Sequence, residues 1–206
     1  TVRTTICDAS ATVNAYDWMV AVDDPMSPDP PLAAINESFG CMHQNINCIY
    51  DVAREWEGVT QDYHARYSDM VVVKAAGNNN CSGRQEACPF TLNSICVGSV
   101  NRSGTMSSFS SDDNPGADPS DPGPDQLDRE EPDVVAYGGD KTTAGVEGAC
   151  VADWEADDGW LEQHGTSFSA PIVTSMLALY REQCEPGLGS RLGAPFLRSL
   201  ARTAAI

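Results

Sequence analysis

The chain has 206 residues, and 41% of them are hydrophobic, which is enough for one domain with a sizeable core and argues against a disordered chain. The 30 acidic residues outnumber the 12 basic ones and give a net charge of −18. We therefore expect no nucleic-acid partner, because binding phosphates needs basic surface, and no membrane partner, because no apolar run approaches the length of a span. Such acidity is also compatible with a bound calcium ion or a high-salt habitat.

The first predicted elements are a helix, a short strand and a second helix. Apolar residues recur at helical spacing over residues 11–22, and the proline-rich stretch 23–31 must end that helix. A short apolar run over residues 32–35 predicts a strand, and residues 36–40 (NESFG) resemble a turn. Residues 47–67 again show one apolar face and predict a helix.

The second half of the chain continues the alternation. The runs at residues 70–73 and 95–100 are short and rich in β-branched residues, so they predict strands buried on both faces. Residues 111–133 are rich in Asp, Pro and Gly and predict an exposed loop. A strand over 134–136 and a helix over 168–183 complete the pattern, which indicates an α/β fold with a mostly parallel sheet and no second domain.

The eight cysteines favour an oxidising environment, so we expect a secreted, extracellular protein with disulfide bonds. The pairs Cys41/Cys48 and Cys81/Cys88 share one spacing, which would suit two small stapled loops. A metal site is the alternative, but the sequence contains no C-x-x-C. Connectivity stays open, because eight cysteines allow about 105 pairings.

The clearest chemical signal lies in residues 164–171 (HGTSFSAP), where a turn of small residues leads into an apolar helix. Ser167 sits at that junction, where free N–H groups and the helix dipole favour developing negative charge. On this evidence alone, a serine that merely caps the helix would be the better interpretation.

The same segment resembles the serine motif of the subtilisin family, G-T-S-x-[SA]-x-P, and matches it in full from Gly165 to Pro171. Further segments resemble the family in the same order, from about residue 11 to 179: residues 35–40, 71–78, 97–100 with 107–111, and 131–136. The resemblance implies a three-layer α/β fold and a serine endopeptidase, of which residues 1–206 form the C-terminal portion of one catalytic domain.

The resemblance also implies roles for individual residues. Ser167 would be the nucleophile, and its backbone N–H together with the Asn78 side chain would stabilise the oxyanion of the tetrahedral intermediate. The alternative for Asn78 is an ordinary turn residue, since Gly-Asn is a common turn pair. Two segments would hold an extended polypeptide substrate: Ser38, Phe39 and Gly40 on one side, and Ala75, Ala76 and Gly77 on the other.

The general base and its orienting carboxylate are the main departure from the family. The motifs D-[ST]-G and H-G-[TS]-H do not occur. His43 and His64 are expected at the surface, and Asp8 lacks the residues that follow the family's aspartate. His164 lies three residues before Ser167 but has no recognisable orienting partner.

We therefore expect a missing N-terminal segment of the same catalytic domain to supply the Asp and His, and this chain alone to have little activity. The alternative is a non-catalytic module that binds extended peptides. An α/β hydrolase is a third and weaker alternative, which we set aside because its motif G-x-S-x-G requires glycine where this chain has Ser169. Lys74 interrupts an apolar strand, so its amine should reach water or a carboxylate.

Overall fold

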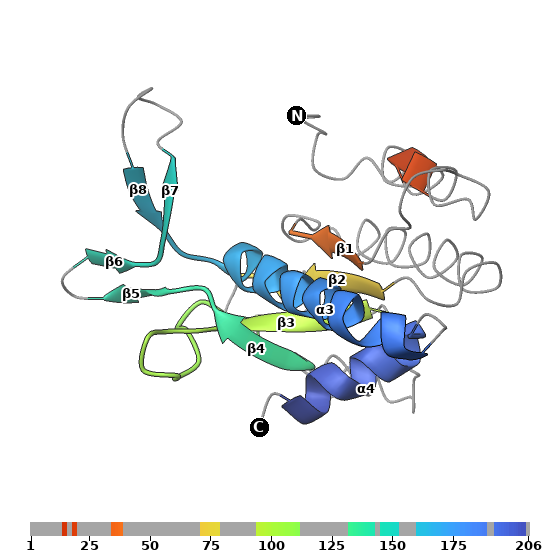
Figure 1. Ribbon diagram of the computed structural model, residues 1–206. Coiled ribbons are helices and arrows are strands. Elements are labelled where there is room, and N and C mark those ends of the chain that lie inside the picture. Colours follow the sequence, from red (N-terminus) through yellow and green to blue (C-terminus); the bar gives the residue numbers. More distant parts are fainter. Residues whose placement is uncertain are drawn as a thin grey trace, which may run out of the picture.

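The computed structural model shows a parallel sheet crossed by a long helix, with two hairpins extending to one side (Figure 1). It describes residues 14–15, 18–19, 34–38, 71–78, 94–111, 132–142, 145–152, 160–188 and 192–204. Residues 14–15 and 18–19 are helical, as predicted within 11–22. The predicted helix over 47–67 and most of the predicted loop over 111–133 lie outside the described residues.

Four parallel strands form the central sheet in the order β1-β2-β3-β4. They are β1 (Ala34–Glu37), β2 (Val71–Ala75), β3 (Ser94–Val100) and β4 (Val134–Tyr137). Every residue of β2 and all but the last of β3 are buried, as the run of β-branched residues predicted for central strands. The α/β prediction with a parallel sheet is confirmed, and the carboxyl ends of all four strands lie at one edge.

The predicted bounds of β1 and β2 were wrong by about two residues. β1 begins at Ala34 and includes Asn36 and Glu37, which the sequence suggested were part of a turn, and β2 continues through Lys74 and Ala75. The register explains why both strands extend this far, because Glu37 of β1 is opposite Lys74 of β2. The two buried side chains form an ion pair. Polar residues that would be costly alone are thereby accommodated in adjacent strands.

Helix α3 (Thr166–Leu188) covers one face of the sheet. Its inner side chains Ala170, Val173 and Leu177 pack with alternate sheet residues in one hydrophobic cluster, together with Leu197 of helix α4 (Ala194–Ala204). The sheet residues of this cluster are Val71, Val73, Ala75, Ile95, Val97 and Val134. The cluster anchors α3 so that its first turn lies at the carboxyl edge of the sheet (Figure 1).

The predicted start of this helix was wrong. α3 begins at Thr166 rather than residue 168, so Ser167 lies inside its first turn and Pro171 is the sixth residue of the helix. A proline at that position removes the N–H that would bond the carbonyl of Ser167, and a side chain from β1's end replaces it, as described below.

Two antiparallel hairpins lie between β4 and α3 and were not predicted. β5 (Asp140–Thr142) pairs with β6 (Gly145–Glu147), and β7 (Ala149–Ala152) pairs with β8 (Trp160–Gln163). Each strand has only three or four residues, too few for periodicity to be read from sequence. The last strand, β8, leads directly into the turn that precedes Ser167.

Cysteine chemistry is only partly visible in the described residues. Cys96 in β3 is disulfide-bonded, whereas Cys184 near the end of α3 carries a free thiol. The chain therefore does not pair all eight of its cysteines, and the two loop pairs expected from spacing lie outside the described residues.

Candidate active site

Three segments that are distant in sequence meet at the carboxyl edge of the sheet. Ser38 follows β1, residues 76–78 follow β2, and Thr166 and Ser167 open α3. Because the strands are parallel, the ends of β1 and β2 are neighbours, and α3 contacts both strands. The structure thus brings together the described residues of the predicted site, while Phe39 and Gly40 lie outside the described residues.

Ser38 and Ser167 are joined by two hydrogen bonds. The Ser38 Oγ donates to the Ser167 carbonyl oxygen at 3.1 Å, and the Ser167 Oγ donates to the Ser38 carbonyl oxygen at 3.4 Å. The second bond is long and therefore weak, so the Ser167 hydroxyl can turn toward a stronger acceptor. The Ser167 side chain is half-buried at the first turn of α3. No acidic residue in that turn offsets the positive end of the helix dipole.

The Asn78 side chain is held by the residue adjacent to Ser167. Its Oδ1 accepts a hydrogen bond from the Thr166 backbone N–H at 2.9 Å and another from the Thr166 Oγ1 at 3.0 Å. Two donors on the oxygen fix the orientation of the amide, so its NH2 group is directed away from Thr166. Asn78 is exposed, and none of the described residues accepts a hydrogen bond from its Nδ2. The amide is a pre-oriented donor beside the serine.

The backbone around this pair is shaped by two glycines. The Gly77 N–H donates to the Thr166 Oγ1 at 3.1 Å, and the same hydroxyl donates to the Asn78 Oδ1. Thr166, the first residue of α3, thus contacts two successive residues after β2. Gly165 has a φ of 156°, and a Cβ there would stand 3.4 Å from the Asn78 Nδ2. A side chain at residue 165 would therefore be strained by the backbone conformation and would lie in van der Waals contact with the amide.

The buried side chains of Ser99 and Ser169 pack against Gly138, where the turn before α3 meets the end of β4. The sequence did not indicate this role. The Gly165 N–H donates to the Gly138 carbonyl at 2.9 Å, and the Ser169 Oγ donates to the Ala136 carbonyl at 3.0 Å. A Cβ on Gly138 would lie 2.4 Å from the Oγ atoms of both Ser169 and Ser99. The end of β4 is thus packed against the serine turn with no room for another methyl group.

His164 does not contact Ser167 in the described hydrogen-bond network. Its ring packs on Phe109 with centroids 4.9 Å apart, and its buried Nδ1 has no hydrogen-bond partner among the described residues. An imidazole without an orienting carboxylate is poorly placed to act as a general base. His43, His64 and Asp8 lie outside the described residues.

A buried ion pair lies directly before the two predicted substrate walls. The Lys74 Nζ is 3.8 Å from the Glu37 Oε2, and both side chains are buried, on the sheet face opposite α3. Burial raises the pKa of Glu37 to about 7, and the smaller attraction of Lys74 opposes that rise. The expectation that the Lys74 amine reaches a carboxylate is confirmed, but the sequence did not identify Glu37 as its partner.

The predicted substrate wall of β2 is made of small, buried residues. Ala75 and Ala76 are 7% and 3% exposed, and the Ala76 N–H bonds the Val97 carbonyl at 2.9 Å, which fixes the wall to β3. On the other side of the wall, the Gly77 carbonyl accepts from the Ser111 N–H at 3.0 Å. These two bonds tie the wall to β3 and to Ser111, while its binding role remains a prediction.

No group of three or more His, Cys, Asp or Glu side chains that could hold a metal is found within the described ranges. The expectation of calcium stays a prediction. Among the same residues, no helix is both long enough and apolar enough to cross a membrane.

Comparisons with known proteins agree with this geometry. The family model Peptidase_S8, which describes the subtilase family, matches residues 4–204. A search of curated proteins finds no match.

Several solved structures share the fold. The prenylagaramide maturation protease PagA matches with a TM-score of 0.61 and 16% identity, and the match covers 99% of this chain and 59% of that chain. The self-cleaved protease domain of PatA has a TM-score of 0.57 and 18% identity, covering 91% and 57%. A cold-adapted subtilisin-like serine proteinase has a TM-score of 0.56 and 19% identity, covering 95% and 54%. The chain thus spans between half and three fifths of the length of these proteins.

Proposed function

The chain belongs to the subtilase family of serine peptidases, and from that premise we propose that it carries the nucleophile and the oxyanion site of a peptide-bond hydrolase. Ser167 would be the nucleophile, and Asn78 would be the side-chain donor to the oxyanion. The observation that carries the proposal is the anchoring of the Asn78 Oδ1 by Thr166, which leaves the amide N–H groups free beside Ser167.

The chemistry follows from these positions. The Ser167 Oγ would attack the carbonyl carbon of the scissile peptide, and its proton would pass to a histidine base. The carbonyl oxygen becomes negative as the tetrahedral intermediate forms, and the Asn78 Nδ2 and the Ser167 backbone N–H would stabilise that charge. The base would then protonate the leaving amine, and water would hydrolyse the acyl-enzyme to regenerate Ser167.

We propose that the histidine and its orienting aspartate belong to a polypeptide segment outside these 206 residues. The sequence contains neither motif that would supply them, and its solved relatives are longer than this chain. The long hydrogen bond from the Ser167 Oγ to the Ser38 carbonyl would then be replaced by a stronger one to the base.

The substrate class would be an extended polypeptide. Ser38, Phe39 and Gly40 would pair with its backbone on one side and Ala75, Ala76 and Gly77 on the other, so that the peptide adds as a strand. The small side chains of Ala75 and Ala76 would leave room for the residue before the cut bond. Secretion, further disulfides besides that of Cys96, and a bound calcium ion belong to the same proposal.

A peptide-binding module without catalysis is the second candidate. It is favoured by one observation, namely that no described residue contacts the Ser167 hydroxyl as a base. Such a module would retain the walls around Ser38 and Ala75 and would bind peptides without cutting them.

Hydrolysis of an unfolded polypeptide by the complete parent protein separates the two candidates. We expect fragments from the wild type and none from Ser167→Ala, whereas Ser175→Ala, an exposed serine on the same helix, should cut normally. A wild type that binds the polypeptide but releases no fragments would support the binding module instead.

A further inference from the structure

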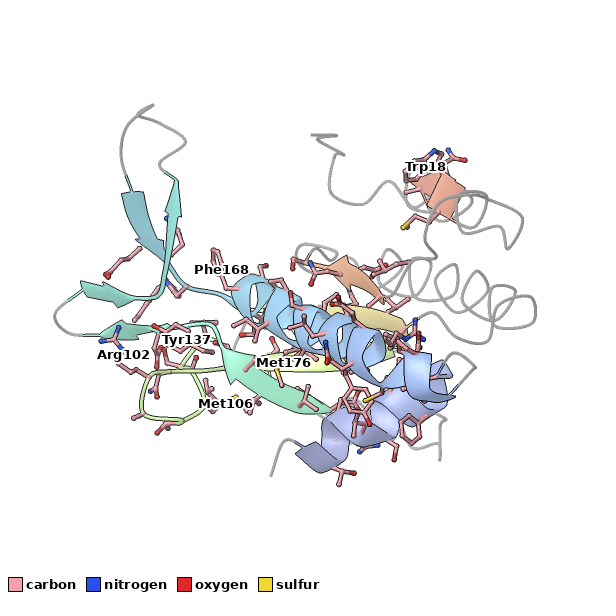
Figure 2. The ribbon with its side chains drawn as sticks, viewed as in Figure 1. Trp18, Arg102, Met106, Tyr137, Phe168 and Met176 are labelled. Carbon is pink, nitrogen blue, oxygen red and sulfur yellow. The ribbon has the colours of Figure 1, made fainter. Side chains whose placement is uncertain are left out.

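Asn36 of β1 takes part in the hydrogen bonds that lead to Ser167. Its Nδ2 donates to the Ser38 Oγ at 3.0 Å, and the Ser38 Oγ donates in turn to the Ser167 carbonyl oxygen at 3.1 Å. An amide and a hydroxyl thus form a chain of hydrogen bonds from β1 to the first turn of α3. Phe168, the residue after Ser167, marks this turn in Figure 2.

Asn36 and Ser38 lie on the face of β1 that meets α3. Side chains alternate along a strand, and Ala34, two residues before Asn36, packs against the hydrophobic cluster that includes α3. The Thr174 Oγ1 of α3 is 3.4 Å from the Asn36 Oδ1. This contact is the weaker of two, because the same hydroxyl donates to the Ala170 carbonyl oxygen at 2.9 Å. The firm link between Asn36 and the helix is therefore the one through Ser38.

Pro171 fixes the direction of these hydrogen bonds. The Ser167 carbonyl oxygen receives no backbone N–H from residue 171, and a carbonyl can only accept, so the Ser38 hydroxyl gives its single proton to it. The same hydroxyl can then only accept a hydrogen bond from its other neighbour. The amide of Asn36 meets this need, because its Nδ2 is a donor.

We propose that Asn36 is a positioning residue for the nucleophile. By donating to the Ser38 hydroxyl, Asn36 keeps the proton of that hydroxyl directed at the Ser167 carbonyl oxygen. The first turn of α3 is thereby held at the end of β1. The inference rests on the proposed function, because it concerns the place of Ser167 relative to the scissile peptide.

The position of this turn matters because Ser167 attacks a peptide that Ser38 helps to hold. The attacking oxygen and the carbonyl carbon must come within about 3–3.5 Å of each other in the correct orientation before they react. A displacement of the turn relative to the substrate wall at Ser38 therefore slows the attack. Asn36 is exposed and acts through Ser38, so its effect on the reaction is separable from packing of the core.

Asn36→Asp tests the direction of the hydrogen bonds. Aspartate has the same shape but only acceptor oxygens, and a carboxylate accepts more strongly than a neutral carbonyl, so the Ser38 hydroxyl turns away from Ser167. We expect fluorophosphonate labelling of Ser167 in the complete parent protein to slow by about fivefold, as for Ser38→Ala. Asn14→Asp, at an exposed helical position, adds the same charge and should be labelled at the wild-type rate.

Asn36→Ala should be milder and slow the labelling by about twofold or less. Without the amide, the Ser38 hydroxyl meets no competing acceptor and can still donate to the Ser167 carbonyl oxygen. A role in packing alone predicts the opposite order, because alanine removes atoms that aspartate retains. Slower labelling of Asn36→Ala than of Asn36→Asp would therefore overturn the inference.

The Ser38→Ala background separates the hydrogen bond from the added charge. If Asn36 acts through the Ser38 hydroxyl, Asn36→Asp should slow labelling no further once that hydroxyl is absent. A second slowing of about fivefold in this background would show that the new charge acts on the reaction directly, and Asn36 would lose its positioning role.

Urea unfolding of the same proteins separates failure of this inference from failure of the proposed function. For Asn36→Ala, Ser38→Ala and the double variant, the changes in the unfolding equilibrium constant should depart from a simple product by about twofold or more, because the two side chains are bonded. Such a departure in a parent protein that is never labelled would reject the proposed function and support the bond from Asn36 to Ser38. A simple product in a normally labelled protein would support the proposed function and reject the role of Asn36.

Discussion

The Ser38 Oγ donates a 3.1 Å hydrogen bond to the Ser167 carbonyl oxygen, which joins the end of β1 to the first turn of α3. In an uninterrupted helix that carbonyl would accept from the backbone N–H of residue 171, but Pro171 has none. Pro171 thus leaves the Ser167 carbonyl oxygen without a donor from the helix, and the Ser38 hydroxyl at the end of β1 donates to it instead. One side chain thereby sets the position of Ser167 relative to the proposed substrate wall.

Ser38→Ala removes this bond and leaves the Ser167 carbonyl without its partner. A neutral hydrogen bond contributes about 1 kcal/mol, which corresponds to roughly a fivefold change in rate if the bond positions the nucleophile. We expect acylation of Ser167 in the complete protein to slow by about that factor, as measured by the rate of fluorophosphonate labelling. Ser175→Ala serves as the control, and equal rates for the two variants would contradict the positioning role of Ser38.

Gly165→Ala should damage the site more than it damages the fold. An alanine at this positive φ is strained by about 1–3 kcal/mol, and relief of that strain would shift the backbone that leads into Thr166, which holds the Asn78 amide. Gly104→Ala is a suitable control, because Gly104 has a φ of 80° and no atom lies within 4 Å of the place that its new methyl group would occupy.

Both glycine variants should lower the free energy of unfolding, as measured by urea titration. Only Gly165→Ala should also slow the labelling of Ser167. If Gly104→Ala slowed labelling to the same degree, the effect would be one of stability rather than of the Asn78 position.

Glu37 should make stability depend on pH near neutrality. Its pKa is about 7 in the folded chain, against 4.5 for the ordinary group, because burial disfavours the carboxylate. The folded state therefore holds the proton more tightly, and this contribution is complete below pH 4.5 and is lost as the pH rises through 7. The difference amounts to about 3 kcal/mol at most.

Urea unfolding of the wild type and Glu37→Gln at several pH values measures this effect. Relative to the variant, the wild type should lose stability between pH 4.5 and 7, while Glu162→Gln, at an exposed position, should run parallel to the wild type. Parallel curves for Glu37→Gln and the wild type would show that the carboxyl titrates normally.

Asn78→Ala should lower turnover by the complete protein while leaving KM nearly unchanged. The lost donor acts on the oxyanion, which exists only in the transition state and the tetrahedral intermediate. In subtilisin, removal of one such donor lowers kcat by ~10²–10³, and we expect an effect of that order. A large rise in KM with kcat unchanged would instead assign Asn78 to substrate binding.

The sequence was most informative about the central strands and about the residues that match the motifs of the family. The strands over β2 and β3 were predictable from their β-branched runs, and the convergence of residues near 38, 78 and 167 followed from the resemblance to the subtilisin family. The partner of Lys74 was not predictable, because residues 36–40 (NESFG) resemble a turn and only the register shows that Glu37 faces Lys74.

Other features depend on contacts between distant segments. The bond from Ser38 to the Ser167 carbonyl requires both Pro171 and the docking of α3 on β1, which no local pattern encodes. Ile172, Met176 and Leu179 of α3 are apolar in the sequence, but their exposure depends on how the helix packs in the folded chain. The short hairpins before α3 lack any period long enough to detect.

The site of covalent labelling by a fluorophosphonate in the complete parent protein is the most direct test of the central claim. Peptide mapping by mass spectrometry should find one adduct, on Ser167, and Ser167→Ala should abolish it. An adduct on another serine, or a wild type that stays unlabelled while its fold and peptide binding are intact, would contradict the assignment of Ser167 as the nucleophile.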